Sequence, residues 1–288
     1  MNEAMNFRKK VGITLVFIII LSIVIGLKTT YFKKAVNLQT EIKKANSNNV
    51  MVFAHRGMLY HNPEHSFAGY NENIKDGATI IEQDVHITKD GVLIVSHDDN
   101  LKRVTGDDIS ITKSNYSQIK NSKLRNGEKI HTLDQVLDKY KDKVNYAIEA
   151  KRELQGDYHL EKKIAETVNR HKLTKNTLIQ DADLNGLIAI HKEPNFNNVP
   201  TLWLENDKSF SKNYKNDIDK APKYITFISI PLGTLTPEIV NYVHDKKHLV
   251  NTWTLANFDD NVKAKELKSD SVFSNDAKFT LKYFKNSF

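Results

Sequence analysis

The sequence predicts an α/β fold, a closed (β/α)8 TIM barrel, from three observations. Short β-rich runs alternate with helical runs along most of the 288 residues. The β-rich runs number eight and cover residues 50–54, 79–85, 144–150, 177–180, 200–205, 224–230, 248–255 and 271–274. No G-x-G-x-x-G or Walker loop follows the first run, which disfavours the alternative of an open, doubly wound sheet. Strict alternation implies parallel strands with right-handed crossovers, and eight such units close most naturally into a barrel.

Helical segments are predicted between these strands, and several begin behind a Ser, Thr or Asp cap. They cover residues 66–76, 132–141, 159–172, 182–191, 210–220, 236–246 and 258–267. One stretch, residues 90–133, breaks the alternation and is too long for a simple connection. We expect it to form an inserted hairpin followed by an excursion over one end of the barrel.

The first 49 residues are predicted to lie outside the barrel domain, which covers residues 50–288. Residues 11–27 are uncharged and apolar and follow a short basic tail, residues 1–10, that we expect in the cytoplasm. Their length is at the short end of the roughly 17 to 25 residues that span a bilayer, and they are apolar on all faces. We therefore expect one transmembrane helix, with a cleaved signal peptide as the alternative, although no small-x-small cleavage site follows. The polar residues 28–49 are predicted to form a stalk.

The charges around this apolar run indicate two opposite orientations. Lysines after the run outnumber the basic residues before it, so a simple count would place the large domain inside the cell. Long domains, however, are translocated largely regardless of such charges, and a short basic tail usually stays in the cytoplasm. We expect a single-pass protein of the cell membrane with an extracellular large domain.

The composition excludes several classes of site. The chain has 42 Lys and Arg against 35 Asp and Glu, but its lysines are scattered rather than gathered into a stripe with aromatic residues. Such a pattern is typical of a solvated surface, so we expect no nucleic-acid partner. The absence of cysteine excludes disulfides, thiolate metal sites and a cysteine nucleophile, so any metal must bind oxygen or nitrogen ligands.

Charged side chains gather at the ends of three predicted strands. The first strand ends in His55 and Arg56, and the second and third carry the pairs Glu82 with Asp84 and Glu149 with Lys151. Members of each i, i+2 pair share one face, because strand side chains alternate. Active sites of (β/α)8 barrels form at the carboxyl ends of the strands, so these groups should converge. Carboxylates in that number suit Mg²⁺ or Ca²⁺.

Two histidines leave extended runs beside this acidic cluster. His55 ends the first strand, and His97 follows the run "VLIVS" in the insertion. Imidazole, with an unperturbed pKa of about 6.5, gives and takes protons near neutrality, so both are candidate acid/base groups. Other histidines are interpreted as structural or surface residues: His86, His131, His159, His171, His191, His244 and His248.

Several motifs together resemble the glycerophosphodiester phosphodiesterase family. They are "AHRG" (54–57), "PEHS" (63–66), "IEQDVHITKDGVLIVSHDDNLKRVTG" (81–106), "HTLDQVL" (131–137), "IEAK" (148–151) and "NTWTLAN" (251–257). The resemblance covers nearly everything after residue 49, and the order of the motifs makes it specific.

The resemblance implies a metal-dependent barrel that cleaves glycerol-linked phosphodiesters into an alcohol and glycerol 3-phosphate. It implies these roles: His55 and His97 as the acid/base pair, Glu82, Asp84 and Glu149 as ligands of one Mg²⁺ or Ca²⁺, Arg56 and Lys151 as phosphate contacts, Glu64 as a support of the site or a contact of the bound ligand, and Trp253 on the glycerol side. Which histidine is the acid stays open. So does the nucleophile, which is either water or a glycerol hydroxyl acting through a cyclic intermediate.

Some positions depart from the family pattern. His65 and Ser66 stand where Asn and Thr are usual, "QDAD" (180–183) replaces a Gln-Ser-Phe-Asp type segment, and His131 replaces a Pro. We expect the first two departures to border the pocket and to affect substrate choice. The substrates in view are glycerophosphodiesters, lipid headgroups and glycerol-phosphate polymers of a cell envelope. The alternatives are a non-catalytic barrel that binds phosphate or polymer at the membrane, and a phosphodiesterase of another lipid class.

Overall fold

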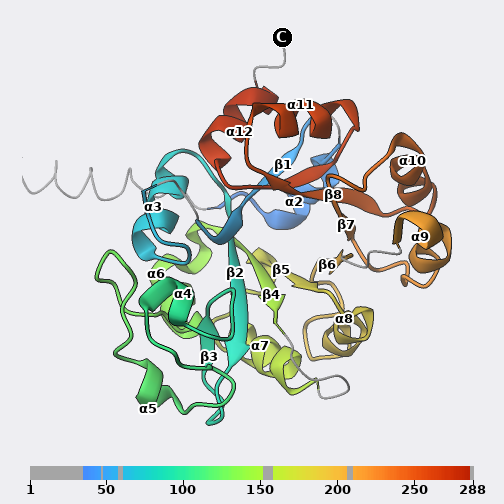
Figure 1. Cartoon of the computed structure of the whole chain (residues 1–288). Coiled ribbons are helices and arrows are strands. Elements are labelled where there is room, and N and C mark those ends of the chain that lie inside the picture. The colour runs from blue at the N-terminus through green and yellow to red at the C-terminus, as the bar shows by residue number, and fades with distance from the viewer. Residues whose placement is uncertain (1–34, 47, 58–60, 152–157, 206–209, 286–288) are drawn as a thin grey trace, which may run out of the picture. The chain divides into compact units, whose positions relative to one another are not determined.

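Eight parallel strands close into a barrel in the computed structural model, which describes residues 35–46, 48–57, 61–151, 158–205 and 210–285 (Figure 1). The strands are β1 Met51–Ala54, β2 Ile80–Ile87, β4 Asn145–Ala150, β5 Thr177–Asp181, β6 Thr201–Leu204, β7 Phe227–Pro231, β8 Leu249–Leu255 and β9 Ser271–Ser274. Their order is β1-β9-β8-β7-β6-β5-β4-β2, and pairing of β1 with β2 closes the circle. The predicted barrel and its eight strands are confirmed.

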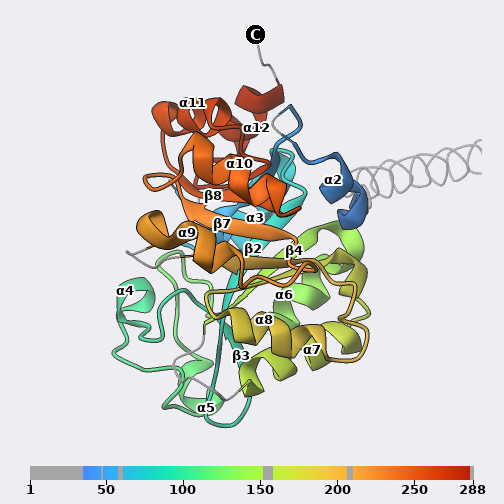
Figure 2. The same cartoon turned by 90° about the vertical axis from the view of Figure 1, so that its right-hand side faces the viewer.

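Helices surround the strands on the outside (Figures 1 and 2). They are α3 Phe67–Lys75, α6 Leu133–Tyr140, α7 His159–Arg170, α8 Leu184–His191, α9 Phe210–Ile218, α10 Pro237–Asp245, α11 Phe258–Glu266 and α12 Ala277–Lys285. Side-chain caps begin several of them: the Ser66 hydroxyl accepts from Gly69 N at 3.0 Å, and Thr132 forms a capping box with Gln135. All helices expected between strands are present, whereas α12 was not predicted.

The interior of the barrel is apolar at one end and polar at the other. At the amino ends of the strands, Phe53, Leu178, Leu202 and Phe227 are buried in one cluster. Each of these side chains points inward, because alternate residues of a strand face opposite sides. On β1, β2, β4 and β5 the next inward positions carry polar side chains, namely His55, Glu82, Glu149 and Gln180, so the polar site lies at the carboxyl end, on a packed apolar floor.

The described part of the predicted stalk, residues 35–46 and 48–49, belongs to the barrel domain. A short helix, α2 Leu38–Lys44, packs Leu38 at 0% exposure into the apolar floor. Asn145 at the start of β4 donates from Nδ2 to the backbone oxygen of Val36 at 2.9 Å. Residues 35–46 therefore close the amino end of the barrel, and the predicted domain start at residue 50 is too late. The helix α2 was not recognised from the sequence, because its polar stretch has two apolar residues that pack inward, Leu38 and Ile42, which make a weak helical pattern.

Replacing Leu38 with alanine is expected to lower the free energy of unfolding by about 2–5 kcal/mol, since the change leaves a cavity in the floor. Urea unfolding followed by circular dichroism measures it. Thr40→Ala alters an exposed position of the same helix and is expected to change stability by less than about 0.5 kcal/mol. Equal stabilities of the two variants would show that α2 does not hold the barrel.

The predicted transmembrane segment, residues 11–27, lies outside the described residues, as do residues 1–10 and 28–34. Within the described ranges, no helix combines the length and hydrophobicity needed to cross a bilayer. This finding corrects the predicted location, a single-pass protein of the cell membrane with an extracellular domain.

The insertion of residues 90–133 forms a small subdomain at the carboxyl end of β2. Strand β3, Leu93–Val95, runs antiparallel to β2 with Val85 opposite Val95, which is the expected hairpin. Two short helices follow, α4 Lys102–Thr105 and α5 Tyr116–Ile119. The subdomain has its own apolar cluster, made of Ile94, Leu101, Val104, Ile111, Ile119, Leu124 and Ile130. This core fixes the loop after β3, which carries His97.

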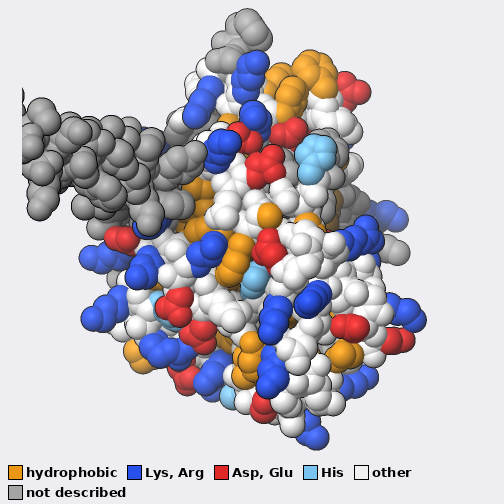
Figure 3. Space-filling model, turned by 90° about the vertical axis from the view of Figure 1, so that its left-hand side faces the viewer, with side chains coloured by type: hydrophobic (Ala, Val, Ile, Leu, Met, Phe, Trp, Pro, Cys, Tyr) orange, Lys and Arg blue, Asp and Glu red, His pale blue; other side chains and the backbone are white. Residues whose placement is uncertain are grey.

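Charged side chains are interspersed on the surface. On the face shown in Figure 3, Lys and Arg alternate with Asp and Glu and with uncharged groups. Ion pairs on the surface of the described residues include Lys102 with Asp108 at 3.1 Å and Lys278 with Asp76 at 3.1 Å. Exposed pairs of this kind contribute about 0–1 kcal/mol each, so they keep the surface solvated more than they stabilise the fold.

Candidate active site

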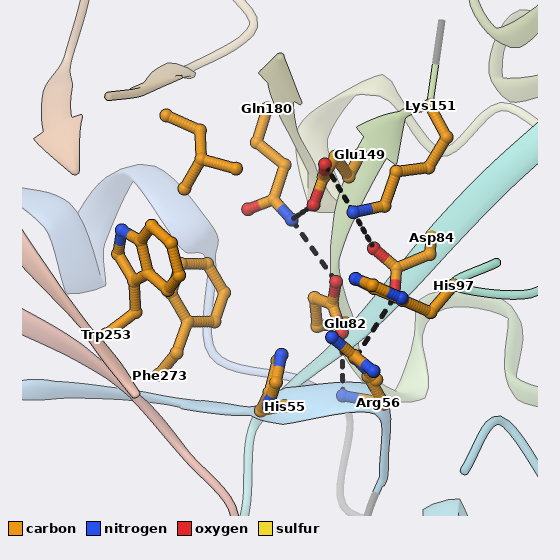
Figure 4. Close-up of a pocket in the computed structure, with 11 residues that line it drawn as sticks. His55, Arg56, Glu82, Asp84, His97, Glu149, Lys151, Gln180, Trp253 and Phe273 are labelled. Atoms are coloured by element: carbon orange, nitrogen blue, oxygen red, sulfur yellow. Dashed lines mark hydrogen bonds and ion pairs between the residues drawn. The ribbon is translucent and has the colours of Figure 1, made fainter. Parts of the chain in front are cut away.

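A cavity of about 190 Å³ opens at the carboxyl end of the barrel (Figure 4). Its lining consists of His55, Arg56, Glu82, Asp84, His97, Glu149, Lys151, Gln180, Leu204, Trp253 and Phe273. Every residue predicted for the site is among them except Glu64. The structure therefore brings together groups from six strands, from the turn after β1 and from the insertion, far apart in the sequence.

A sharp turn after β1 directs His55 and Arg56 into the site. Residues His55–Gly57 form a single 3-10 turn in which Arg56 has φ 54° and Gly57 has φ 59°. A Cβ atom on Gly57 would overlap the ring of Tyr70, so the position excludes every larger residue. The turn also aims the backbone N–H of Arg56 at Glu82 Oε2, 2.6 Å away.

Three carboxylates converge in the wall of the cavity. Glu82 and Asp84 face inward from β2, and Glu149 lies opposite Asp84 on β4. All three are at most 7% exposed. Burial and the charges of the neighbouring acids raise the pKa of Glu82 well above its usual value and that of Glu149 to about 8. Against the effect of burial, the hydrogen bond from His65 and the charge of Lys151 hold the pKa of Asp84 well below its usual range.

Cationic and amide groups hold these acids in place. Lys151 Nζ lies 3.1 Å from Asp84 Oδ1 and 2.7 Å from Glu149 Oε1, and these two acids raise its pKa although burial opposes the charge. Gln180 Nε2 donates to Glu82 Oε1 and Glu149 Oε2, each at 3.2 Å. The sequence analysis placed the segment 180–183 at the border of the pocket but gave Gln180 no role, although its place at the inward end of β5 was a usable signal.

The donor set fits a divalent cation. His65, Glu82 and Asp84 each offer a ligand atom, and these atoms lie within 4.8 Å of one another. Glu149 is joined to the same cluster through Lys151 and Gln180. Burial, and after it the charges of the neighbouring acids, raises the pKa values of Glu82 and Glu149, and the positive charge of a bound cation would offset both effects.

His65 lies behind Asp84 rather than at the cavity. Its Nε2 is 3.0 Å from Asp84 Oδ2, and its Nδ1 is 2.8 Å from the hydroxyl of Tyr70. His65 does not line the cavity, so the prediction that it borders the pocket is wrong. Of the two segments that depart from the family pattern and were expected there, "QDAD" does border the cavity, through Gln180. The backbone of His65 has φ 56°, a conformation that Asn, Asp and His adopt more readily than other side chains.

The two histidines present their rings to the cavity in different settings. His55 Nδ1 is 2.7 Å from Asn275 Oδ1, an acceptor, so Nδ1 carries the proton and Nε2 faces the cavity (Figure 4). Burial and the charge of Arg56 lower the pKa of His55 to about 4. His97 Nδ1 is 2.7 Å from Asp98 Oδ1, and the ring is one-third exposed. Burial is the main reason that the pKa of His97 is also lowered.

Glu64 does not line the cavity. Its carboxylate accepts two hydrogen bonds from Arg103, at 2.9 and 2.7 Å, and lies 3.4 Å from Arg56 Nη1. Glu64 thus lies behind Arg56 and outside the cavity lining, and of its two predicted roles the support of the site, rather than a contact of the bound ligand, stays as the prediction.

His55 is expected to titrate near pH 4 rather than near 6.5. In the unfolded chain His55 binds a proton below about pH 6.5, whereas in the folded protein it stays neutral until about pH 4. The contribution of His55 to the free energy of unfolding is therefore lost as the pH falls between those values. NMR titration of ¹³Cε1-labelled histidine measures the midpoint. A midpoint at 6 or above for the resonance that disappears in His55→Asn would contradict the buried, neutral ring.

Comparisons with known proteins agree with this geometry. The sequence profile of the Glycerophosphoryl diester phosphodiesterase family matches residues 55–278. The Glycerophosphodiester phosphodiesterase of Bacillus subtilis (strain 168) is 26% identical over 250 residues, which cover 78% of this chain and 83% of that protein. The human Lysophospholipase D GDPD1 is 41% identical over 66 residues, or 23% of this chain and 21% of that protein.

A solved structure has the same fold. An Oleispira antarctica phosphodiesterase, whose structure was solved in complex with the product sn-glycerol-3-phosphate, superposes with a TM-score of 0.68 at 18% identity, covering 82% of this chain and 97% of that one. The family profile spans most of the chain, including His55, both carboxylates of β2, Glu149 and Trp253. The chain therefore belongs to the glycerophosphoryl diester phosphodiesterase family and is a phosphoric diester hydrolase.

Proposed function

We propose that the protein hydrolyses glycerophosphodiesters to an alcohol and glycerol 3-phosphate, with His55 and His97 transferring protons and a divalent cation bound at Glu82, Asp84 and Glu149. The observation that carries the proposal is the cavity itself. It places two imidazoles, three buried carboxylates and two cationic side chains around one space of about 190 Å³. A small, singly charged phosphodiester needs such a mixture of groups.

Hydrolysis requires one proton to be removed and another to be supplied. The nucleophile loses a proton as its oxygen bonds to phosphorus, and the leaving oxygen gains a proton as its bond to phosphorus breaks. His55 is neutral near pH 7 with Nε2 unprotonated, so we assign it the role of base. His97 has a carboxylate partner, Asp98, that stabilises its protonated form, so we assign it the role of acid.

Charge on the phosphoryl oxygens increases as the nucleophile attacks. Arg56 and Lys151 line the cavity and supply fixed positive charge to those oxygens. A bound Mg²⁺ or Ca²⁺ would add Lewis-acid stabilisation of the same oxygens. We propose the three cavity-lining carboxylates as its ligands and His65 as the group that orients Asp84 from behind.

Two buried polar atoms of the cavity wall suit the glycerol portion of the substrate. Among the described residues, neither Gln180 Oε1 nor Trp253 Nε1 has a hydrogen-bond partner. The first can only accept a hydrogen bond and the second can only donate one. Hydroxyl groups do both, so we propose that hydroxyls of the glycerol portion contact these atoms, which adds a polar contact to the predicted ring contact of Trp253.

Gln180→Met is expected to raise the KM for glycerophosphocholine roughly five- to tenfold, because one hydrogen bond to the substrate is lost. The value of kcat should fall as well, since Glu82 and Glu149 lose their shared donor. Steady-state kinetics measure both. The matched control is Gln83→Met, the same exchange at a buried position on the opposite face of β2. An unchanged KM in Gln180→Met would exclude the proposed contact.

A substrate panel tests the function. Glycerophosphocholine, glycerophosphoethanolamine, lysophosphatidylcholine and poly(glycerol phosphate) share a glycerol phosphate joined to a second group, and they differ in what lies beyond it. Release of glycerol 3-phosphate or of its acylated form would be followed with Mg²⁺ and with Ca²⁺. Binding without turnover for every member would exclude the proposed hydrolysis and identify a phosphate-binding barrel instead.

A further inference from the structure

Arg103 lies where the inserted subdomain meets the barrel, and it contacts an acid on each side. It comes from α4 in the insertion. Its Nη1 and Nη2 donate to Glu64 Oε2 and Oε1 at 2.9 and 2.7 Å, and its Nε donates to Asp98 Oδ2 at 2.5 Å. Three of the five guanidinium N–H groups are thus used, in the planar geometry that lysine cannot reproduce.

Each of these acids contacts a residue of the cavity. Asp98 lies 2.7 Å from Nδ1 of His97, and Glu64 lies 3.4 Å from Nη1 of Arg56. Both His97 and Arg56 line the cavity. A continuous chain of charged contacts therefore runs from His97 through Asp98, Arg103 and Glu64 to Arg56, and Arg103 is its centre.

The contacts of Arg103 differ in how easily they could be replaced by water. The side chain of Glu64 is 6% exposed. If Arg103 were lost, Arg56, the weaker partner, would be the one ion-pair partner left to this buried carboxylate among the described residues. The side chain of Asp98 is 34% exposed and could turn toward solvent. Hydrogen bonds from Arg103 and His97 hold the pKa of Asp98 at about 2, which keeps it ionised beside His97.

We propose that Arg103 is a positioning residue. It holds His97 through Asp98 and Arg56 through Glu64, so that these two cavity residues keep a fixed position relative to each other. In this way Arg103 couples the inserted subdomain to the reaction. Arg103 is not expected to touch the substrate, since it does not line the cavity. The inference rests on the proposed function for its kinetic consequences. Its structural consequence, a defined tautomer and orientation of His97, can be measured without turnover.

The kinetic experiment compares Arg103→Ala and Arg103→Lys with Lys102→Ala in the full-length chain. Arg103→Ala is expected to lower kcat about 10- to 100-fold, because misplaced catalytic groups cost rates of this order. The kcat of Arg103→Lys should be little higher than that of Arg103→Ala, while added guanidinium ion should restore part of the rate of Arg103→Ala. Lys102, the neighbour on α4, pairs with exposed Asp108 and should stay within about twofold of the parent rate.

A double variant separates positioning from general loss of structure. In a His97→Ala background, Arg103→Ala should lower kcat by a clearly smaller factor than in the parent, because one of the two groups that Arg103 positions is already absent. Equal fold losses with and without His97, or no rescue by guanidinium, would overturn the proposal. So would a parent-like rate for Arg103→Ala.

NMR of ¹⁵N-labelled histidine tests the positioning role of Arg103 without measuring activity. The parent should show His97 protonated at Nδ1, and Arg103→Ala should show a mixture of tautomers at the same pH. An unchanged His97 spectrum would refute the positioning role. If the parent protein hydrolyses no phosphodiester, the proposed function fails, and this spectrum still decides the inference about Arg103.

Discussion

Replacing either histidine of the cavity with alanine is expected to lower kcat for glycerophosphocholine by roughly 10²- to 10⁴-fold. His55 is the proposed base and His97 the proposed acid, and each transfers one proton of the same reaction. The double variant His55→Ala, His97→Ala should be only slightly slower than the slower single variant, because groups that act in one step do not contribute additively. Stopped assays of glycerol 3-phosphate at saturating substrate measure these rates.

The leaving group distinguishes the two histidines. A diester with a p-nitrophenyl leaving group needs no proton on departure, so His97→Ala should lose much less activity on it than on glycerophosphocholine, whereas His55→Ala should lose similar activity on both. His191→Ala is the control, because the ring of His191, the last residue of α8, stacks on Tyr224 and lies outside the cavity. Parent-like rates for His55→Ala or His97→Ala would remove the proposed mechanism.

The site was largely predictable from the sequence because a barrel converts strand ends into neighbours. Alternation on β2 places Glu82 and Asp84 on one face, and the parallel register brings Glu149 opposite Asp84. Motifs with a fixed position relative to a strand, such as His55 at the end of β1, are therefore located as soon as the eight strands are recognised.

Other features depend on contacts that no local pattern reveals. The strand position of Gln180 did not show that its amide bridges acids of β2 and β4. Glu64 follows β1 closely in sequence, yet its partner Arg103 is 39 residues away and turns it from the cavity. Leu38 looked like part of a polar stalk, because its burial depends on a floor formed by strands much later in the chain.

Replacing Glu149 with glutamine is expected to make the metal-free protein more stable at pH 8 and almost inactive. In the folded protein Glu149 has a pKa of about 8, against 4.5 for an ordinary glutamate. The unfolded chain therefore loses this proton near pH 4.5 while the folded protein keeps it until about pH 8, so the free energy of unfolding falls as the pH rises between these values. Glutamine carries no charge and removes that decline, which should stabilise the protein at pH 8 by about 1–2 kcal/mol.

The same change should remove the response to divalent cations. A cation that binds only the folded parent raises its midpoint of thermal unfolding, and loss of one carboxylate ligand should weaken binding by at least about tenfold. Thermal unfolding at pH 8 with EDTA, Mg²⁺ or Ca²⁺ measures both effects, with Glu166→Gln on the exposed face of α7 as the control. A variant less stable than the parent in EDTA would show that the ion pair with Lys151 outweighs the repulsion among the acids. A parent-like cation response would show that Glu149 is not a ligand, because the loss of a ligating carboxylate must weaken binding of the cation.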